Sequence, residues 1–163
     1  MRRGARLPQH AALIVEILLA ESAEAIDRCA QVLAQLRTGL TCGEIVRRID
    51  EQRRQSGYRV AYLESGGQVE SVAGFRVTSH LAWGRTLYVD DLVTREQHRS
   101  SGFGSALFDW LIELARREDC SQLHLDSGVQ RFDAHRFYLH KGMDITSHHF
   151  ALKLTLSNVP RGK

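Results

Sequence analysis

The sequence lacks any apolar run long enough to span a membrane, because polar or charged residues interrupt each hydrophobic stretch. The stretch Ala11–Ala20 follows a basic N-terminus, as a signal peptide would. However, Glu16 interrupts it, and the polar segment 8–10 stands where its apolar part should begin. We therefore expect no membrane association and no leader here, and instead a first strand over Ala12–Ala20.

A large excess of charge of either sign is also missing. The net charge is only +3, from 22 basic and 19 acidic residues. Much of the excess lies near the chain ends, at Arg2, Arg3, Arg6, Arg161 and Lys163. Without a basic stripe the sequence predicts no nucleic-acid partner, although the phosphates of a small cofactor remain compatible with this balance.

Cysteine is scarce, and no two cysteines have the spacing of a metal or redox motif. Cys29, Cys42 and Cys120 lie far apart. Free thiols of this kind are typical of a reducing compartment, so we expect a cytoplasmic protein. The histidines likewise lack metal-ligand spacing: His135 and His140 are five apart, off the i, i+4 spacing of a helix. We expect no metal.

Internal repeats and long linkers are absent as well, and 163 residues are enough for one domain with a core. We expect that domain over residues 11–155, with a flexible basic tail over residues 1–10 and a C-terminal tail over residues 156–163.

Hydrophobic periodicity predicts both helices and strands. Thr41 and Glu44 have capping-box spacing, and Gly39, Gly57 and Gly142 stand where helices are expected to end. The expected order is a strand (12–20), two helices (22–37 and from Thr41 to near Gly57), three strands (58–63, 69–77 and 86–94), a helix after Gly104, a strand (123–125), a helix (134–140) and a strand through Phe150, Leu152 and Leu154. A β-α-β unit in the C-terminal half implies one parallel pair in a mostly antiparallel sheet, an α+β fold.

The most informative segment runs from Asp90 to Gly104, from a strand through a loop into a helix. Gly102 and Gly104 open that helix. Glycine permits positive φ and close approach of a ligand, and a helix N-terminus presents unpaired N–H groups with partial positive charge. With Arg99 nearby, the segment suits an anion such as a pyrophosphate.

Two other interpretations of this segment remain. One is an ordinary glycine-assisted turn into a helix. The other is a dinucleotide-binding site, since Asp126 follows about 20 residues on, where a ribose-binding acid would stand. Against it, Leu107 occupies the third glycine position, antiparallel strands precede the motif, and too little chain follows for more β-α-β units.

Three stretches together resemble the GNAT superfamily of N-acetyltransferases over roughly residues 12–154. Residues 99–104 (Arg-Ser-Ser-Gly-Phe-Gly) match the family pattern Q/R-x-x-G-x-G/A, and Asp91–Thr94 is similar to the preceding strand end. Residues 134–143 resemble the family's A-x-x-F-Y-x-x-x-G-F segment. The resemblance implies a mixed sheet with helices on both faces, and transfer of an acetyl group from acetyl-CoA to an amine.

The resemblance also implies which residues bind the cofactor. Backbone N–H groups of residues 100–105 would hold the pyrophosphate, and the strand would bulge at residues 92–94 and splay from residues 123–126. A thioester carbonyl would lie near an N–H of Leu92 or Val93. The implied cofactor residues are Leu92, Val93, Thr94, Arg99, Ser100, Ser101, Gly102, Phe103, Gly104, Ser105 and Arg131. Arg131 replaces a common asparagine, and Met143 replaces an aromatic residue, so each departs from the family pattern.

Acetyl transfer needs a base, because an amine with a pKa near 10.4 is protonated at neutral pH. Asp90 and Asp91 are the candidates, with Asp90 ranked first by the resemblance. Adjacent residues of a strand point to opposite faces, so at most one should face the acceptor. Tyr138 is the candidate acid for the departing thiolate, although a core tyrosine would fit the same pattern.

The acceptor stays open. The expectation is the primary amine of a small molecule, attacking the thioester directly. A protein lysine or N-terminus is an alternative acceptor, and a non-catalytic acyl-CoA-binding domain is a further alternative. Dimers are common in the family, so the resemblance leaves a homodimer open.

Overall fold

The computed structural model describes residues 15–154, and the predicted tails over residues 1–10 and 156–163 lie outside this range. The chain divides after Leu125 into two compact units, residues 1–125 and 126–163. No helix in the described range has the length and apolar character needed to cross a membrane.

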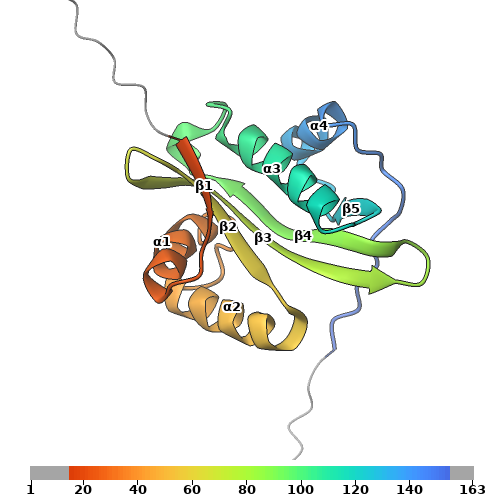
Figure 1. Cartoon of the computed structure of the whole chain (residues 1–163), viewed down its shortest axis with the longest axis horizontal. Helices are drawn as coiled ribbons and strands as arrows, with labels where there is room; N and C mark the ends of the chain where they lie inside the picture. The colour runs from red at the N-terminus through yellow and green to blue at the C-terminus, as the bar shows by residue number, and fades with distance from the viewer. Residues whose placement is uncertain (1–14, 155–163) are drawn as a thin grey trace, which may run out of the picture. The chain divides into compact units, whose positions relative to one another are not determined.

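The first unit is built on one mixed sheet with the strand order β1-β2-β3-β4-β5 (Figure 1). Neighbours are antiparallel except β4 and β5, which are parallel because α3 forms the crossover between them. The predicted single parallel pair is therefore confirmed. The strands are β1 (Val15–Leu19), β2 (Arg59–Ser65), β3 (Gln68–His80), β4 (Gly84–Thr94) and β5 (Gln122–Leu125).

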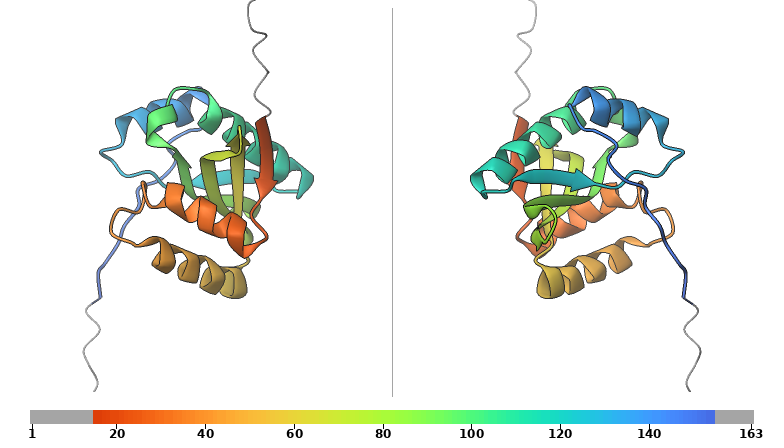
Figure 2. Two further views of the ribbon diagram at one scale, coloured as in Figure 1. Left: turned by 90° about the vertical axis from the view of Figure 1, so that its left-hand side faces the viewer. Right: turned by 90° about the vertical axis from the view of Figure 1, so that its right-hand side faces the viewer.

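Helices cover both faces of this sheet, as expected. Figures 1 and 2 show α1 (Ala23–Leu33) and α2 (Cys42–Ser56) on one face and α3 (Phe103–Arg117) on the other. Because β3 is covered on both sides, seven consecutive residues from Val69 to Phe75 are buried. Val32 and Val72 belong to the core beneath α1 and α2.

The ends of α1 and α2 show how local sequence sets helix length. Thr41 and Glu44 form the predicted capping box, and Gly57 ends α2 with a left-handed φ of 65°. In contrast, α1 ends at Leu33, not near Gly39 as expected. After Leu33 the chain continues in a tighter turn, in which some N–H groups donate to the carbonyl three residues before them. The N–H of Leu36, for example, donates to the carbonyl of Leu33 over 3.0 Å.

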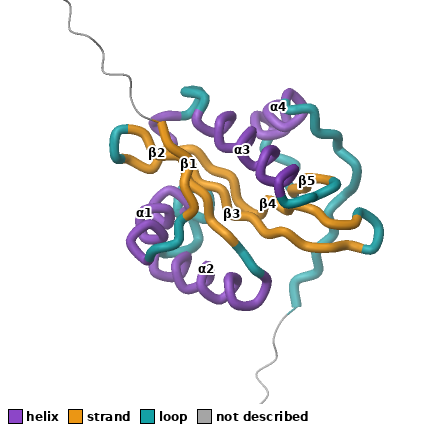
Figure 3. Tube along the Cα trace, viewed as in Figure 1, coloured by secondary structure: helices purple, strands orange, loops and turns teal. Residues whose placement is uncertain are grey.

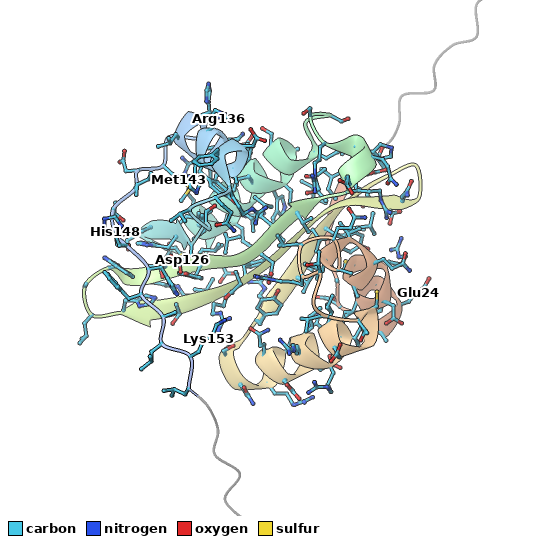
Figure 4. All side chains as sticks on the ribbon, turned by 180° about the vertical axis from the view of Figure 1, so that it is seen from behind. Glu24, Asp126, Arg136, Met143, His148 and Lys153 are labelled. Carbon is cyan, nitrogen blue, oxygen red and sulfur yellow. The ribbon has the colours of Figure 1, made fainter. Side chains whose placement is uncertain are left out.

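The second unit contains α4 (Phe132–His140) among its described residues, and Gly142 follows with a φ of 81°, as predicted. Arg136 points outward from α4 (Figure 4). The strand expected through residues 150–154 is not formed, since residues 144–154 contain no helix or strand. Phe150 is 90% exposed. Alternation specifies a strand only where a neighbouring backbone pairs with it, and here none does within the described chain.

Candidate active site

The connection between β4 and α3 is the segment in which the sequence predicts phosphate binding. It contains a short 3-10 turn, η1 (Glu96–His98), and enters α3 through Gly102. Figure 3 shows α3 and β4, the two elements that this segment connects. Gly102 has a φ of 86°, and a Cβ there would meet no described atom within 4 Å. The backbone conformation, rather than a lack of space, therefore requires glycine at this position.

The N-terminus of α3 has no side-chain cap among the described residues. By contrast, Ser22 caps α1 and Thr41 caps α2. No acidic residue stands in the first turn of α3 either. Its first N–H groups thus keep their hydrogen-bonding capacity, and the partial positive charge of the helix end is not neutralised locally. Such an end is matched to the oxygens of a phosphate.

Gly104 serves a different purpose, which is close packing of α3 on β4. A Cβ at Gly104 would lie only 2.8 Å from Thr94 Oγ1. Beneath it, the buried Ser71 hydroxyl donates to the carbonyl of Val93 over 3.0 Å and lies 3.1 Å from Thr94 Oγ1. The two glycines of the motif therefore have separate physical reasons, one conformational and one steric.

The C-terminal half of β4 has an open edge. Pairing of β4 with β5 covers Thr86 to Val89 only and ends at the pair Val89–Leu125. Residues 91–94 pair with β3 on one side, and no strand within residues 15–154 pairs with their other side. The predicted divergence of the two strands is consistent with this pairing, and it leaves backbone groups of β4 without a strand partner among the described residues, as an edge that an extended ligand can pair with does.

The backbone N–H of Leu92 points to this open edge. The N–H of Arg95 donates to Glu70 O over 2.7 Å, so residue 95 faces β3. Because the N–H groups of an antiparallel strand alternate in direction, Val93 also faces β3, whereas Leu92 and Thr94 face outward. Of the two residues that the sequence offered for the thioester oxygen, Leu92 has the available donor.

A β-bulge in β4 places both candidate bases on the same face of the sheet. Gly74 pairs with Asp91 and Phe75 pairs with Val89, so Asp90 has no partner residue in β3. The extra residue resets the alternation. Asp90 and Asp91 both bond to side chains on the α1–α2 side, so the expectation of opposite faces is wrong. The bulge also lies before Leu92, not at residues 92–94.

Asp91 is held by two donors from distant parts of the chain. Arg37 Nε donates to Asp91 Oδ1 over 2.7 Å, and the hydroxyl of Tyr58 donates to Oδ2 over 2.7 Å. Burial, reinforced by the nearby negative charge of Asp91, raises the pKa of Tyr58. Tyr58 fits because Gly74 has no side chain: a Cβ there would lie 1.7 Å from the tyrosine oxygen.

Asp90 forms a two-pronged ion pair with Arg76. Arg76 donates to Oδ1 over 2.7 Å and to Oδ2 over 3.0 Å, and it also donates to Gln52 and Ser56 of α2. Burial raises the pKa of Asp90, Arg76 opposes this rise, and the negative charge of Asp91 adds to it. The side chain of Asp90 is 22% exposed, against 13% for Asp91.

The remaining predicted residues of the loop lie around the α3 N-terminus. Arg99 is exposed, with its guanidinium 3.9 Å from Glu96. Ser100 takes a left-handed φ of 65°, and Ser101 is exposed beside it. Phe103 and Ser105 are half-buried in the first turn of α3. The first unit therefore brings together the predicted phosphate loop, the strand end and both candidate bases.

The second unit carries the other two predicted residues. Tyr138 is half-buried on α4, with its ring edge-on to Phe137 at a centroid distance of 5.4 Å. Burial raises the pKa of the Tyr138 hydroxyl, and the positive charge of Arg131 offsets part of that rise. Arg131 stands at the N-cap position of α4. The two residues therefore interact electrostatically within one unit.

Sequence reasoning missed the partners of the two aspartates, namely Arg37, Tyr58 and Arg76. No local pattern marks them, since Arg37 and Asp91 are 54 residues apart. The isolated Gly74 inside a strand pattern was the available signal, because such a glycine indicates a bulge or a close approach.

Comparisons with known proteins agree with this geometry. Residues 26–143 match the model of the acetyltransferase (GNAT) family. An uncharacterized N-acetyltransferase of Bacillus subtilis, YhdJ, is 32% identical over 73% of this chain and 84% of its own length. An aminoalkylphosphonate N-acetyltransferase of Salmonella typhimurium is 26% identical over 63% of this chain and 73% of its own.

A solved structure shares the fold. An aminoglycoside N-acetyltransferase in complex with CoA superimposes with a TM-score of 0.77, at 10% identity over 90% of this chain and 99% of its own. At that identity the likeness shows the fold alone. The match to the family model and the 32% identity to YhdJ show that the chain belongs to the GNAT family and is an N-acetyltransferase.

Proposed function

We propose that the protein transfers the acetyl group of acetyl-CoA to the primary amine of a small molecule by direct attack. The observation that carries the proposal is the uncapped N-terminus of α3, opened by Gly102, beside the open edge of β4. Together they offer an anion site and a row of backbone groups, which match the pyrophosphate and the amide-bearing arm of one cofactor.

The residues fit this cofactor. The first N–H groups of α3 and the exposed Arg99 would hold the pyrophosphate, and the edge of β4 would pair with the arm. Acetyl-CoA supplies the acetyl group as an activated thioester. The outward N–H of Leu92 would donate to the thioester oxygen as that atom gains negative charge. The CoA complex of the aminoglycoside N-acetyltransferase supports this choice of cofactor.

Asp90 is the proposed base. It accepts the proton of the attacking amine, directly or through one water molecule. Burial raises its pKa, which makes it a better proton acceptor than an ordinary aspartate. It is also the more exposed of the two carboxylates. Asp91, the less exposed carboxylate, is the second candidate, and its bonds to Arg37 and Tyr58 help to fix the bulge.

Tyr138 is the proposed acid. Because burial raises the pKa of its hydroxyl, Tyr138 stays protonated at neutral pH and can give its proton to the departing thiolate. Arg131, whose positive charge lowers this pKa, would help to stabilise the phenolate left after transfer.

Support for a small-molecule acceptor comes from the Salmonella relative, whose named substrate class is an amine that carries a phosphonate. A panel of amines tests the proposal: aminoalkylphosphonates, aminosugars, and peptides with a lysine or a free N-terminus, with release of free CoA thiol as the readout. Turnover on a small amine that exceeds turnover on every peptide supports the proposal. Turnover confined to peptides, or acetyl-CoA binding without turnover on any amine, contradicts it.

A further inference from the structure

Glu70 is a buried carboxylate outside the proposed chemistry. It lies on β3 and is 4% exposed, among the core residues Val69 and Val72. A carboxylate in such a position is costly unless a donor or a positive charge pairs with it. Its partner is His98, whose Nδ1 lies 2.5 Å from Glu70 Oε2.

His98 belongs to η1, within the loop that precedes α3. The carbonyl of His98 accepts from the N–H of Ser101 over 3.4 Å, and its ring meets the ring of Phe103 edge-on at 6.4 Å. His98 therefore lies between the buried carboxylate and the two residues that flank Gly102. Its position is coupled to the residues that open the anion site.

The same loop is tied to the body of the unit at two further points. The backbone of Arg95 donates to Glu70 O over 2.7 Å, and its side chain donates to Val69 O over 3.1 Å. The N–H of Glu96 donates to Gln35 of the α1 C-terminal turn over 2.9 Å. These bonds fix the start of the loop, whereas the bond between Glu70 and His98 fixes its middle.

We propose that Glu70 is a positioning residue for cofactor binding: through His98 it holds residues 96–102 in the conformation that presents the N-terminus of α3 to the pyrophosphate. The proposal rests on the function proposed above. Glu70 itself touches no substrate. Substitution of Glu70 lowers the fraction of molecules whose loop is in the binding conformation, and the apparent affinity for CoA falls by the same factor.

The test is calorimetric titration of CoA into the full chain and into the Glu70→Gln variant. Glutamine keeps the size of the side chain and removes its charge. One charge-assisted hydrogen bond corresponds to a loss of affinity of about tenfold or more. We therefore expect Glu70→Gln to bind CoA about tenfold or more weakly. Its kcat at saturating acetyl-CoA should be unchanged, and amide exchange in residues 96–102 of the free protein should be faster.

A second variant keeps the test decisive if Glu70→Gln does not fold. The His98 side chain is 42% exposed, so His98→Ala should preserve the core and still weaken CoA binding. The double variant should be no weaker than the single ones, because both remove the same bond. Glu113→Gln, which breaks an exposed ion pair on α3, is the matched control and should bind as the wild type does.

The outcomes separate the two proposals. Wild-type binding of CoA that stays unchanged in Glu70→Gln and His98→Ala overturns the positioning role alone, as does a fall in kcat at unchanged affinity. A wild-type protein that does not bind CoA overturns the proposed function and this inference with it.

Discussion

Gly74→Ala should destabilise the first unit strongly, because the added methyl group would occupy the space of Tyr58. The new Cβ would lie 1.7 Å from the tyrosine oxygen, 2.4 Å from Cζ and 3.0 Å from Asp91 Oδ2. These atoms are not a flexible side-chain end, since Tyr58 is 3% exposed and bonded to Asp91. The ring must move, and the hydrogen bond to the carboxylate must break.

The loss of stability expected for Gly74→Ala has two parts. Forcing an extra methyl group into a packed core costs about 1–3 kcal/mol. Breaking a hydrogen bond to a charged carboxylate costs about 1.5–3 kcal/mol. The expected loss in the free energy of unfolding is therefore about 2.5–6 kcal/mol, a large share of the ~5–15 kcal/mol that such a domain has. Tyr58→Phe removes only the hydrogen bond and should lose only the second part.

Urea denaturation of the purified proteins measures these losses. Gly43→Ala is the matched control, because it adds the same methyl group on α2 where no described atom lies within 4 Å. It should stabilise the protein slightly, since alanine favours a helix by up to about 1 kcal/mol over glycine. A Gly74→Ala variant within about 1 kcal/mol of the wild type, or less destabilised than Tyr58→Phe, would refute the reasoning.

Three further substitutions test the chemistry and the electrostatics. Asp90→Asn should lower kcat by about 10²–10⁴-fold at unchanged CoA affinity, and a variant with full turnover would exclude Asp90 as the base. Tyr138→Phe should lower kcat with no effect on CoA affinity, and turnover equal to that of the wild type would remove the proposed acid. Glu118→Gln concerns acid stability. The bond from Arg59 holds the Glu118 pKa below its usual value of 4.5, so this pair adds stability above that pH and loses it as the pH falls through the folded-state pKa. Urea midpoints should therefore decline less for Glu118→Gln than for the wild type on acidification below pH 4.5, and equal declines would contradict this assignment.

Local chemistry explains which elements the sequence predicts well. Thr41, Glu44 and Gly57 define α2 within a few residues of themselves, so their pattern predicts its bounds. The loop before α3 is predicted for the same reason, because a left-handed glycine and an uncapped helix start are local features.

Features that depend on distant partners escape such reasoning. The bulge at Asp90 is set by the register between β3 and β4, and a shift by one residue reverses which face a side chain occupies. The apolar alternation through Phe150 failed for a related reason, since a strand forms only where another backbone pairs with it. The pairing of Asp90 with Arg76 likewise requires the folded sheet.

The most direct test of the account is calorimetric titration of CoA into the wild type, Gly102→Glu and Gly39→Glu. At Gly102 the substitution places a side chain at a φ of 86° and a negative charge at the N-terminus of α3. Gly39 lies on an exposed loop with no described atom near its Cβ position, so it controls for the added charge. We predict micromolar binding of CoA by the wild type and Gly39→Glu and none by Gly102→Glu. Equal binding by all three proteins, or none by the wild type at millimolar CoA, would contradict the proposed cofactor site.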